Sequence, residues 1–304
     1  MRGRRLWVLA IVTGLLLWVL YTPRRPNPLF PVREPTPPAE PATAFDKTRS
    51  GTVRGTVEWS GPAPVVEPIK LINVRIPPAE TPTVPNPNAP RVGNGHLAEA
   101  VVYLTGIDPR RSAPWKPDRV CVEVKRSALS VKQGERTGRN GIVRSGDSVD
   151  LVSREAVDPL TGGPALHSIR GRGAAFFTQM LPVPNEPVKR VLTGDGVVEL
   201  SSGSGYYWLR AYVLVSDHPY AAVTGPDGGF DFADVPDGEY EAVCWLPNWR
   251  VDRFENDPEL SMWGGPVRMT FRPAVERRQK IVVKAGQVTE LKFTVSAANF
   301  DRER

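Results

Sequence analysis

Residues 209–245 constrain the fold most, because they alternate short apolar runs with turn sequences. Residues 211–215 are almost continuously apolar, which is typical of a strand buried on both faces. The sequence Gly-Pro-Asp-Gly over 225–228 predicts a turn, since proline presets φ at its second position and glycine tolerates the left-handed region. Phe230 and Phe232 would then share one strand face, because strand side chains alternate with period two. This stretch predicts an all-β fold.

Further short strands are predicted on both sides of this stretch. They cover residues 51–59, 98–104, 120–124, 149–152, 239–245, 280–284 and 288–295, while residues 174–181 could be a strand or a turn of helix. Residues 61–90 hold nine prolines and are predicted to be a long loop or a disordered insert, because proline cannot donate to a central ladder. The polar residues 132–141 separate two predicted strands, and the glycine-rich residues 158–173 are predicted to be a loop.

The amino-terminal residues 1–22 predict a membrane anchor. The sequence MRGRR precedes an apolar run over 6–21, and neither a small-residue cleavage motif nor a lipobox cysteine follows directly after that run. Three arginines before the run outnumber the two after it, which favours a cytoplasmic amino end. We therefore expect an uncleaved signal anchor, a single-pass transmembrane helix in the inner (cytoplasmic) membrane, with the body in the periplasm or extracytoplasmic space.

The residues that follow the anchor predict a stalk and a nearly neutral body. Residues 23–50 contain eight prolines and few apolar side chains, a composition that favours extended polyproline II. The first 25 residues carry five arginines and no acid, so the rest of the chain has almost equal numbers of basic and acidic residues. The positive net charge therefore reports the membrane flank, and we expect no nucleic-acid partner.

The stretch over 209–245 resembles the carboxypeptidase regulatory-like (transthyretin-like, prealbumin-like) β-sandwich. The resemblance rests on the order Thr224, Asp227-Gly228, Phe230, Val235-Pro236-x-Gly238 and Tyr240. Together with Arg210-Ala211-Tyr212-Val213 and Asp217-His218-Pro219-Tyr220, it is similar to secreted bacterial proteins that join such a sandwich to a cupredoxin-like segment. It covers roughly residues 51–296 and implies a β-sandwich architecture combining both parts, preceded by the transmembrane helix.

This resemblance implies a division of the chain into successive segments. They are the anchor at 1–22, the stalk at 23–50, the first β strands with the proline-rich loop at 51–118, the cupredoxin-like segment at 119–216, the carboxypeptidase regulatory-like segment at 217–296 and a tail at 297–304.

The resemblance also implies an ancestral copper site, of which most ligands are missing. In the family, one histidine follows an aspartate-containing loop, and a Cys-x-x-His-x-x-Met loop supplies the other ligands. The first element corresponds to Asp158 and His167, but the thiolate position falls on Gly203, the second imidazole on Tyr206 and the thioether on Leu209. Because a blue-copper centre needs two imidazoles and a soft thiolate, we expect no metal and no other cofactor.

Four residues around the former ligand loop are the predicted binding residues: Tyr206, Tyr207, Trp208 and His167. The aromatic side chains could belong to the core, or they could form an exposed platform for a sugar ring or a protein partner. His167 could be a ligand of a new site, or its ring could hydrogen-bond to loop backbone.

Other polar residues have less specific patterns. Cys121 and Cys244 fall on predicted strands and could form a disulfide or remain two separate buried thiols. His218 is expected to be structural and His96 to be solvated. An acidic group could bind Ca²⁺ but is better explained as a solvated loop; it consists of Asp252, Glu255, Asp257 and Glu259.

The sequence contains no recognisable enzyme motif. His-Glu-x-x-His, the P-loop and Gly-x-Ser-x-Gly are all missing, and residues 171–176 lack the third glycine of a dinucleotide-binding loop. The predicted function is a non-catalytic, membrane-anchored, extracytoplasmic binding module whose partner is an unknown envelope protein or polysaccharide. The alternatives are a copper-binding electron-transfer protein with a rearranged site and a structural scaffold of an envelope complex.

Overall fold

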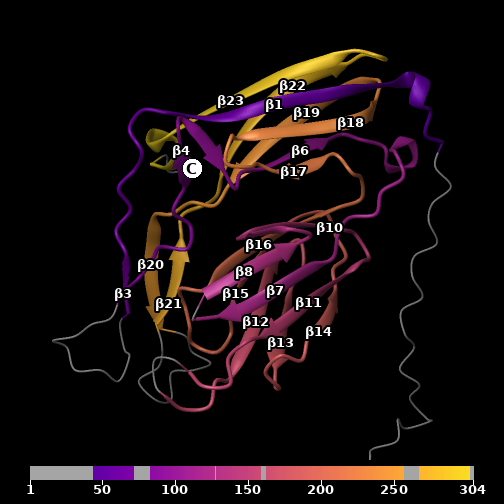
Figure 1. Ribbon diagram of the computed structural model, residues 1–304. Coiled ribbons are helices and arrows are strands. Elements are labelled where there is room, and N and C mark those ends of the chain that lie inside the picture. The colour runs from indigo at the N-terminus through magenta and orange to yellow at the C-terminus, as the bar shows by residue number, and fades with distance from the viewer. Residues whose placement is uncertain (1–43, 72–82, 127, 159–161, 257–266, 302–304) are drawn as a thin grey trace, which may run out of the picture. The chain divides into compact units, whose positions relative to one another are not determined.

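Strand β1 is the central strand of one sheet in the first of two β-sandwiches (Figure 1). Its side chains alternate between buried and more exposed positions, so one face of the strand packs into the core. It pairs with β18 in an antiparallel register and with β23 in a parallel register, so both of its edges are satisfied. This sheet consists of β1 (Ser50–Ser60), β4 (Arg91–Gly93), β5 (His96–Ala98), β18 (Gly229–Pro236) and β23 (Val288–Ser296). The facing sheet consists of β6 (Val101–Thr105), β17 (Ala221–Val223), β19 (Gly238–Leu246) and β22 (Val275–Val283). The apolar core between them includes Val53, Leu104, Phe230 and Ile281.

The second sandwich is formed by the strands that lie in sequence between β6 and β17. One sheet has the order β10 (Asn140–Arg144), β16 (Arg210–Ser216), β15 (Gly196–Ser202), β12 (His167–Gly173) and β13 (Phe177–Leu181). The other has the order β14 (Val188–Val191), β11 (Ser148–Ser153), β7 (Val120–Lys125), β8 (Ala128–Gln133) and β9 (Arg136–Gly138). Val122, Leu151, Ile169 and Val213 belong to its core. Strands on both sides of this insertion therefore complete the first sandwich.

The structure is a computed structural model that describes residues 44–71, 83–126, 128–158, 162–256 and 267–301. Within these ranges the chain is almost entirely strand and turn, so the predicted all-β fold is confirmed. No helix in the described part is long and apolar enough to cross a bilayer. The predicted anchor at 1–22 lies outside the described residues, as does most of the predicted stalk.

Strand β16 is buried along its whole length, as the apolar run over 211–215 predicted. One face of the strand belongs to the core of the second sandwich. The other face carries Tyr212 and Leu214, which pack with Val101 and Trp245 of the first sandwich. The rings of Tyr212 and Trp245 lie 5.0 Å apart, centroid to centroid, in an edge-to-face arrangement. Both faces of β16 are therefore covered by apolar side chains, which explains why its sequence does not alternate.

Short elements complete the fold. Two ribbons pair β2 (Ile69–Lys70) with β3 (Thr83–Val84), and β20 (Val251–Asn256) with β21 (Val267–Phe271). Among the residues that the structure describes, single turns of 3₁₀ helix are η1 (Lys47–Arg49), η3 (Pro109–Arg111) and η5 (Ala297–Phe300).

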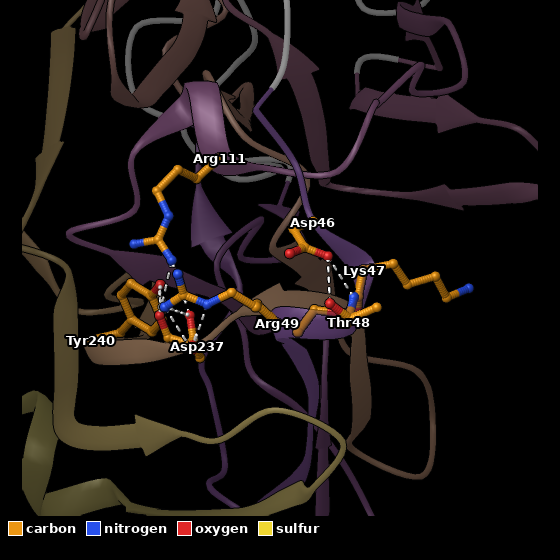
Figure 2. Close-up of polar contacts among 8 residues, drawn as sticks. Asp46, Lys47, Thr48, Arg49, Arg111, Asp237 and Tyr240 are labelled. Carbon is orange, nitrogen blue, oxygen red and sulfur yellow. Dashed lines mark hydrogen bonds and ion pairs between the residues drawn. The ribbon is translucent and has the colours of Figure 1, made fainter.

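Asp237 fixes the chain where the first strand begins. It lies in the turn between β18 and β19 and accepts hydrogen bonds from Arg49 in η1 and Arg111 in η3 (Figure 2). The Nη2 atoms of both arginines lie 3.0 Å from the Asp237 carboxylate. At the start of η1, Asp46 accepts hydrogen bonds from the backbone N–H and the hydroxyl of Thr48. These contacts hold three separate segments together at one end of the first sandwich.

Two predicted irregular segments are strands instead. Residues 132–141 contribute to β8, β9 and β10, and residues 158–173 end in β12 rather than remaining a loop. In β12 the arginines and glycines alternate, so that Ile169 is buried while Arg170 and Arg172 are only partly buried. The two arginines occupy the outward positions of the strand. The alternation was hard to recognise in the sequence because glycine has no side chain to mark the inward positions. Residues 174–181, for which strand and helix were both open, end in strand β13.

Candidate functional site

His167 begins strand β12 and is almost completely buried, with 1% of its surface exposed. Its Nε2 lies 2.9 Å from Oε2 of Glu155, a buried carboxylate that follows strand β11. An ionised carboxylate can only accept hydrogen bonds, so Nε2 is the ring nitrogen that donates. Nδ1 has no hydrogen-bond partner within the described part of the chain. The predicted alternative in which the ring bonds to loop backbone is therefore replaced by a side-chain pair.

Tyr206 covers the ring of His167. The two ring centroids are 4.7 Å apart, and Tyr206 itself is 9% exposed. Burial, together with a hydrogen bond to the carboxylate of Asp158, raises the pKa of Tyr206 above its ordinary value. Glu155, Asp158, His167 and Tyr206 thus form a closed polar cluster inside the second sandwich, called the inner cluster below.

Tyr207 and Trp208 continue this packing and are also buried, with 6% and 5% of their surfaces exposed. Their rings meet edge to face at 5.2 Å, and Trp208 lies 5.5 Å from Tyr206 in a similar arrangement. Of the two predicted alternatives, the structure has the aromatic side chains in the core. A binding role for these residues and His167 stays a prediction.

The residues near His167 do not fit a blue-copper centre. Gly203, at the expected thiolate position, has no side chain, and its N–H donates to the carbonyl of Ser168 at 2.9 Å. A Cβ at Gly203 would lie 2.6 Å from the Ser168 hydroxyl. The side chains that do reach His167 offer a carboxylate and a phenol rather than sulfur, whereas copper of this type needs a soft thiolate. Over the ranges that the structure describes, no three His, Cys, Asp or Glu residues are grouped to hold a metal ion.

The two cysteines are free thiols in different sandwiches. Cys121 lies on β7 and is partly buried, while Cys244 lies on β19 inside the first core. Burial raises the pKa of Cys121 to about 11 and that of Cys244 to about 12. The structure agrees with two separate thiols, the second of the two predicted alternatives.

The two other histidines, His218 and His96, are at least partly buried. His218 is buried and stacked on Tyr220, whose backbone N–H donates to its Nδ1 at 3.2 Å. Burial lowers the pKa of His218, which agrees with the predicted structural role. His96 was predicted to be solvated but is half-buried, because it pairs within β5 between β1 and β4.

The predicted acidic loop is in part a strand. Asp252 and Glu255 lie on β20, where each forms an ion pair with Arg253, because residues 251–256 pair with β21. Asp257 and Glu259 lie outside the described residues.

An arginine-rich hollow on the outer side of β12 was not predicted from the sequence. Arg170 and Arg172 line it together with Arg210 and Arg268. The available signal was the sequence Ile-Arg-Gly-Arg over 169–172, in which charged residues recur every second position. That alternation is typical of a strand with one charged face, but the flanking glycines favoured a loop.

Comparisons with known proteins find no matching family model and no matching curated protein. Solved structures to which the chain is similar include cupredoxins. An oxidised amicyanin mutant is 15% identical over 38% of this chain and 98% of its own, with a TM-score of 0.24. A copper-containing nitrite reductase from Thermus scotoductus SA-01 is 14% identical over 37% of this chain and 27% of its own, with a TM-score of 0.27. A likeness of this extent carries no conclusion about ligands or activity.

Proposed function

We propose that this protein is a membrane-tethered, extracytoplasmic binding module that catalyses no reaction and whose cupredoxin-like sandwich holds no copper. The observation that carries the proposal is the set of side chains around His167. Oε2 of Glu155 lies 2.9 Å from Nε2 of His167, and the ring of Tyr206 covers the imidazole. Where the resemblance expects sulfur, the chain has Gly203 and Leu209.

Burial supports a structural role for the inner cluster. A buried charge is expensive unless it is paired and hydrogen-bonded, and both carboxylates of the cluster have such partners, His167 for Glu155 and Tyr206 for Asp158. With 1% of its surface exposed, His167 offers no face to an external electron donor or acceptor. These paired groups therefore support a role of the inner cluster in stabilising the sandwich from within.

Copper addition to the purified full chain tests this proposal. We expect no copper to be retained through gel filtration and no intense visible band of thiolate-to-copper charge transfer. One retained copper per chain with such a band, both lost in His167→Ala, would instead identify the alternative electron-transfer protein. Cys121→Ser and Cys244→Ser would then show which thiol supplies the sulfur.

The tether rests on the apolar run over 6–21 and the proline-rich residues 23–50. We expect the full chain to stay in the membrane fraction after an alkaline carbonate wash. In intact spheroplasts, added protease should digest the body, because the charge bias places it outside the cytoplasm. Release by carbonate, or protection from protease in intact spheroplasts, would contradict the tether or its orientation.

A further inference from the structure

Strands β12, β15 and β16 are neighbours in one sheet of the second sandwich (Figure 1), and they carry charged residues on its outer face. In the register, Arg170 of β12 lies opposite Ser201 of β15, and Arg172 lies opposite Glu199. Ser201 in turn lies opposite Arg210 of β16. Because side chains on directly opposed residues project from the same face, these five residues form one polar patch.

Strand β21 forms the second wall of this patch, and Arg210 holds it in place. The Nη2 atom of Arg210 donates to the carbonyl of Met269 on β21 at 2.6 Å. Its Nη1 atom donates to the carbonyls of Tyr207 and Leu209 at 2.9 and 2.7 Å. The guanidinium carbon also lies 5.4 Å from the ring centroid of Phe271. Arg210 is only 6% exposed, so a buried cation forms part of a built structure rather than a flexible surface group.

The space between these walls is a hollow of about 220 Å³ that contains an excess of positive charge. Arg170, Arg172, Arg210 and Arg268 line it, and Glu199 is the one acidic residue among the described lining residues. Glu199 is already engaged, since its Oε1 lies 3.2 Å from Nε of Arg210. Within the described ranges, Arg172 and Arg268 form no ion pair, so their charges are not matched by carboxylates of this chain there.

The lining also offers neutral hydrogen-bonding groups. The lining includes the hydroxyl-bearing residues Ser201 of β15, which lies opposite Arg170, and Thr270 of β21. A second hollow of about 280 Å³ adjoins it and shares Arg172, Glu199 and Phe271 as lining residues. Each hollow is smaller than the roughly 300–1,000 Å³ of pockets for drug-sized ligands, so a molecule of monosaccharide size fits better.

We propose that this arginine-lined hollow binds the carboxylate or phosphate group of a small polar ligand of monosaccharide size. Guanidinium groups match such oxyanions through paired N–H donors, and a half-buried site strengthens these bonds relative to open water. The hydroxyls would contact the neutral part of the ligand. This inference rests on the proposed binding function and adds to it a site and a chemical class.

Calorimetric titration of the full chain with four probes tests the inference: glucuronate, glucose 6-phosphate, inorganic phosphate and glucose. We expect at least one of the three anions to bind and glucose to bind at least tenfold more weakly. The affinity should fall as NaCl is raised from low ionic strength, because salt screens the charges. The relative affinities of the three anions distinguish a carboxylate ligand from a phosphate ligand, and a sugar-borne anion from the free ion.

Arg172→Gln and Arg268→Gln should each weaken the anion at least tenfold. Arg277→Gln on β22, far along the chain on an exposed edge strand, is the matched control and should leave the affinity unchanged. Three results would overturn the inference. They are equal anion affinity in Arg172→Gln and the parent, glucose binding as tightly as the anions, and no binding of any anion. If one of these results is obtained while the chain still retains no copper, the proposed metal-free binding module stands, with its binding site elsewhere.

Discussion

The two faces of strand β12 differ in how their charges are balanced. On the inner side, His167 is paired with Glu155, and the adjacent Tyr206 is paired with Asp158. On the outer side, Arg172 faces a hollow whose described acidic residue, Glu199, already contacts Arg210, and Arg172 forms no ion pair with a described residue. Because successive side chains of a strand point to opposite faces, β12 separates the inner cluster from the arginine-lined hollow.

This difference indicates which side chains stabilise the fold and which remain available to a ligand. Buried polar groups that satisfy each other contribute to stability, and removing one of them leaves the other buried and unpaired. Partly exposed arginines cost little when they are replaced, because water solvates their charges in the folded and unfolded states alike. Four substitutions test this contrast, ordered by their expected effect on stability.

Glu155→Ala should have the largest effect, because it leaves the buried Nε2 of His167 without an acceptor. We expect a loss of about 3 kcal/mol in the free energy of unfolding, measured by urea denaturation. Glu155→Gln keeps an oxygen acceptor and should lose clearly less. A change below about 0.5 kcal/mol in the alanine variant would mean that the inner cluster is not a structural pair.

Gly171→Ala should come next, although it adds only a methyl group. A Cβ at this position would overlap the ring of Phe177, which packs across β12 on the inner side. We expect a loss of about 1–3 kcal/mol in urea denaturation, because overpacking forces the ring or the backbone to shift. Gly93→Ala in β4 is the control, since nothing lies within 4 Å of its added Cβ. Equal stabilities of the two variants would contradict the close approach.

Tyr206→Phe should cost about 1 kcal/mol at neutral pH, because Asp158 loses a hydrogen-bond donor. The folded-state pKa of Tyr206 is raised, so its contribution is complete below about pH 10, where tyrosine ionises in the unfolded chain, and is lost as the pH rises further. The stability difference between parent and variant should therefore shrink above about pH 10 in pH-dependent urea denaturation. Tyr103→Phe is a comparison: burial raises the pKa of Tyr103 to about 12, but no acid hydrogen bond contributes. A difference for Tyr206→Phe that stays constant with pH would show that burial does not hold its hydroxyl neutral.

Arg172→Gln should have the smallest effect on stability, within about 0.5 kcal/mol in the same urea experiment. Its charge lies in the hollow and forms no ion pair among the residues that the structure describes. A loss above about 1 kcal/mol would show that the outer face is structural like the inner one. Stability that is unchanged while anion binding weakens would sharpen the contrast between the faces.

Parts of this fold were predictable because their signals are local. The strands over 51–59 and 288–295 alternate apolar and polar residues, and the run over 211–215 is apolar on both faces. Strand β12 was missed because glycines and arginines occupy most of its positions, and neither has a high strand propensity. The aromatic residues 206–208 stand out in the sequence as a dense group, but that sequence fits both a buried and an exposed arrangement.

The order of residues along the chain determined its β character and its turns, and it places Gly203, Tyr206 and Leu209 at the positions where the resemblance implies a thiolate, an imidazole and a thioether. Tertiary structure alone decided that Glu155 reaches His167 and that Arg170 and Arg210 line the same hollow. Such pairs depend on strand register and on which sheets face each other. Those features arise from packing between distant segments, and so no local pattern encodes them.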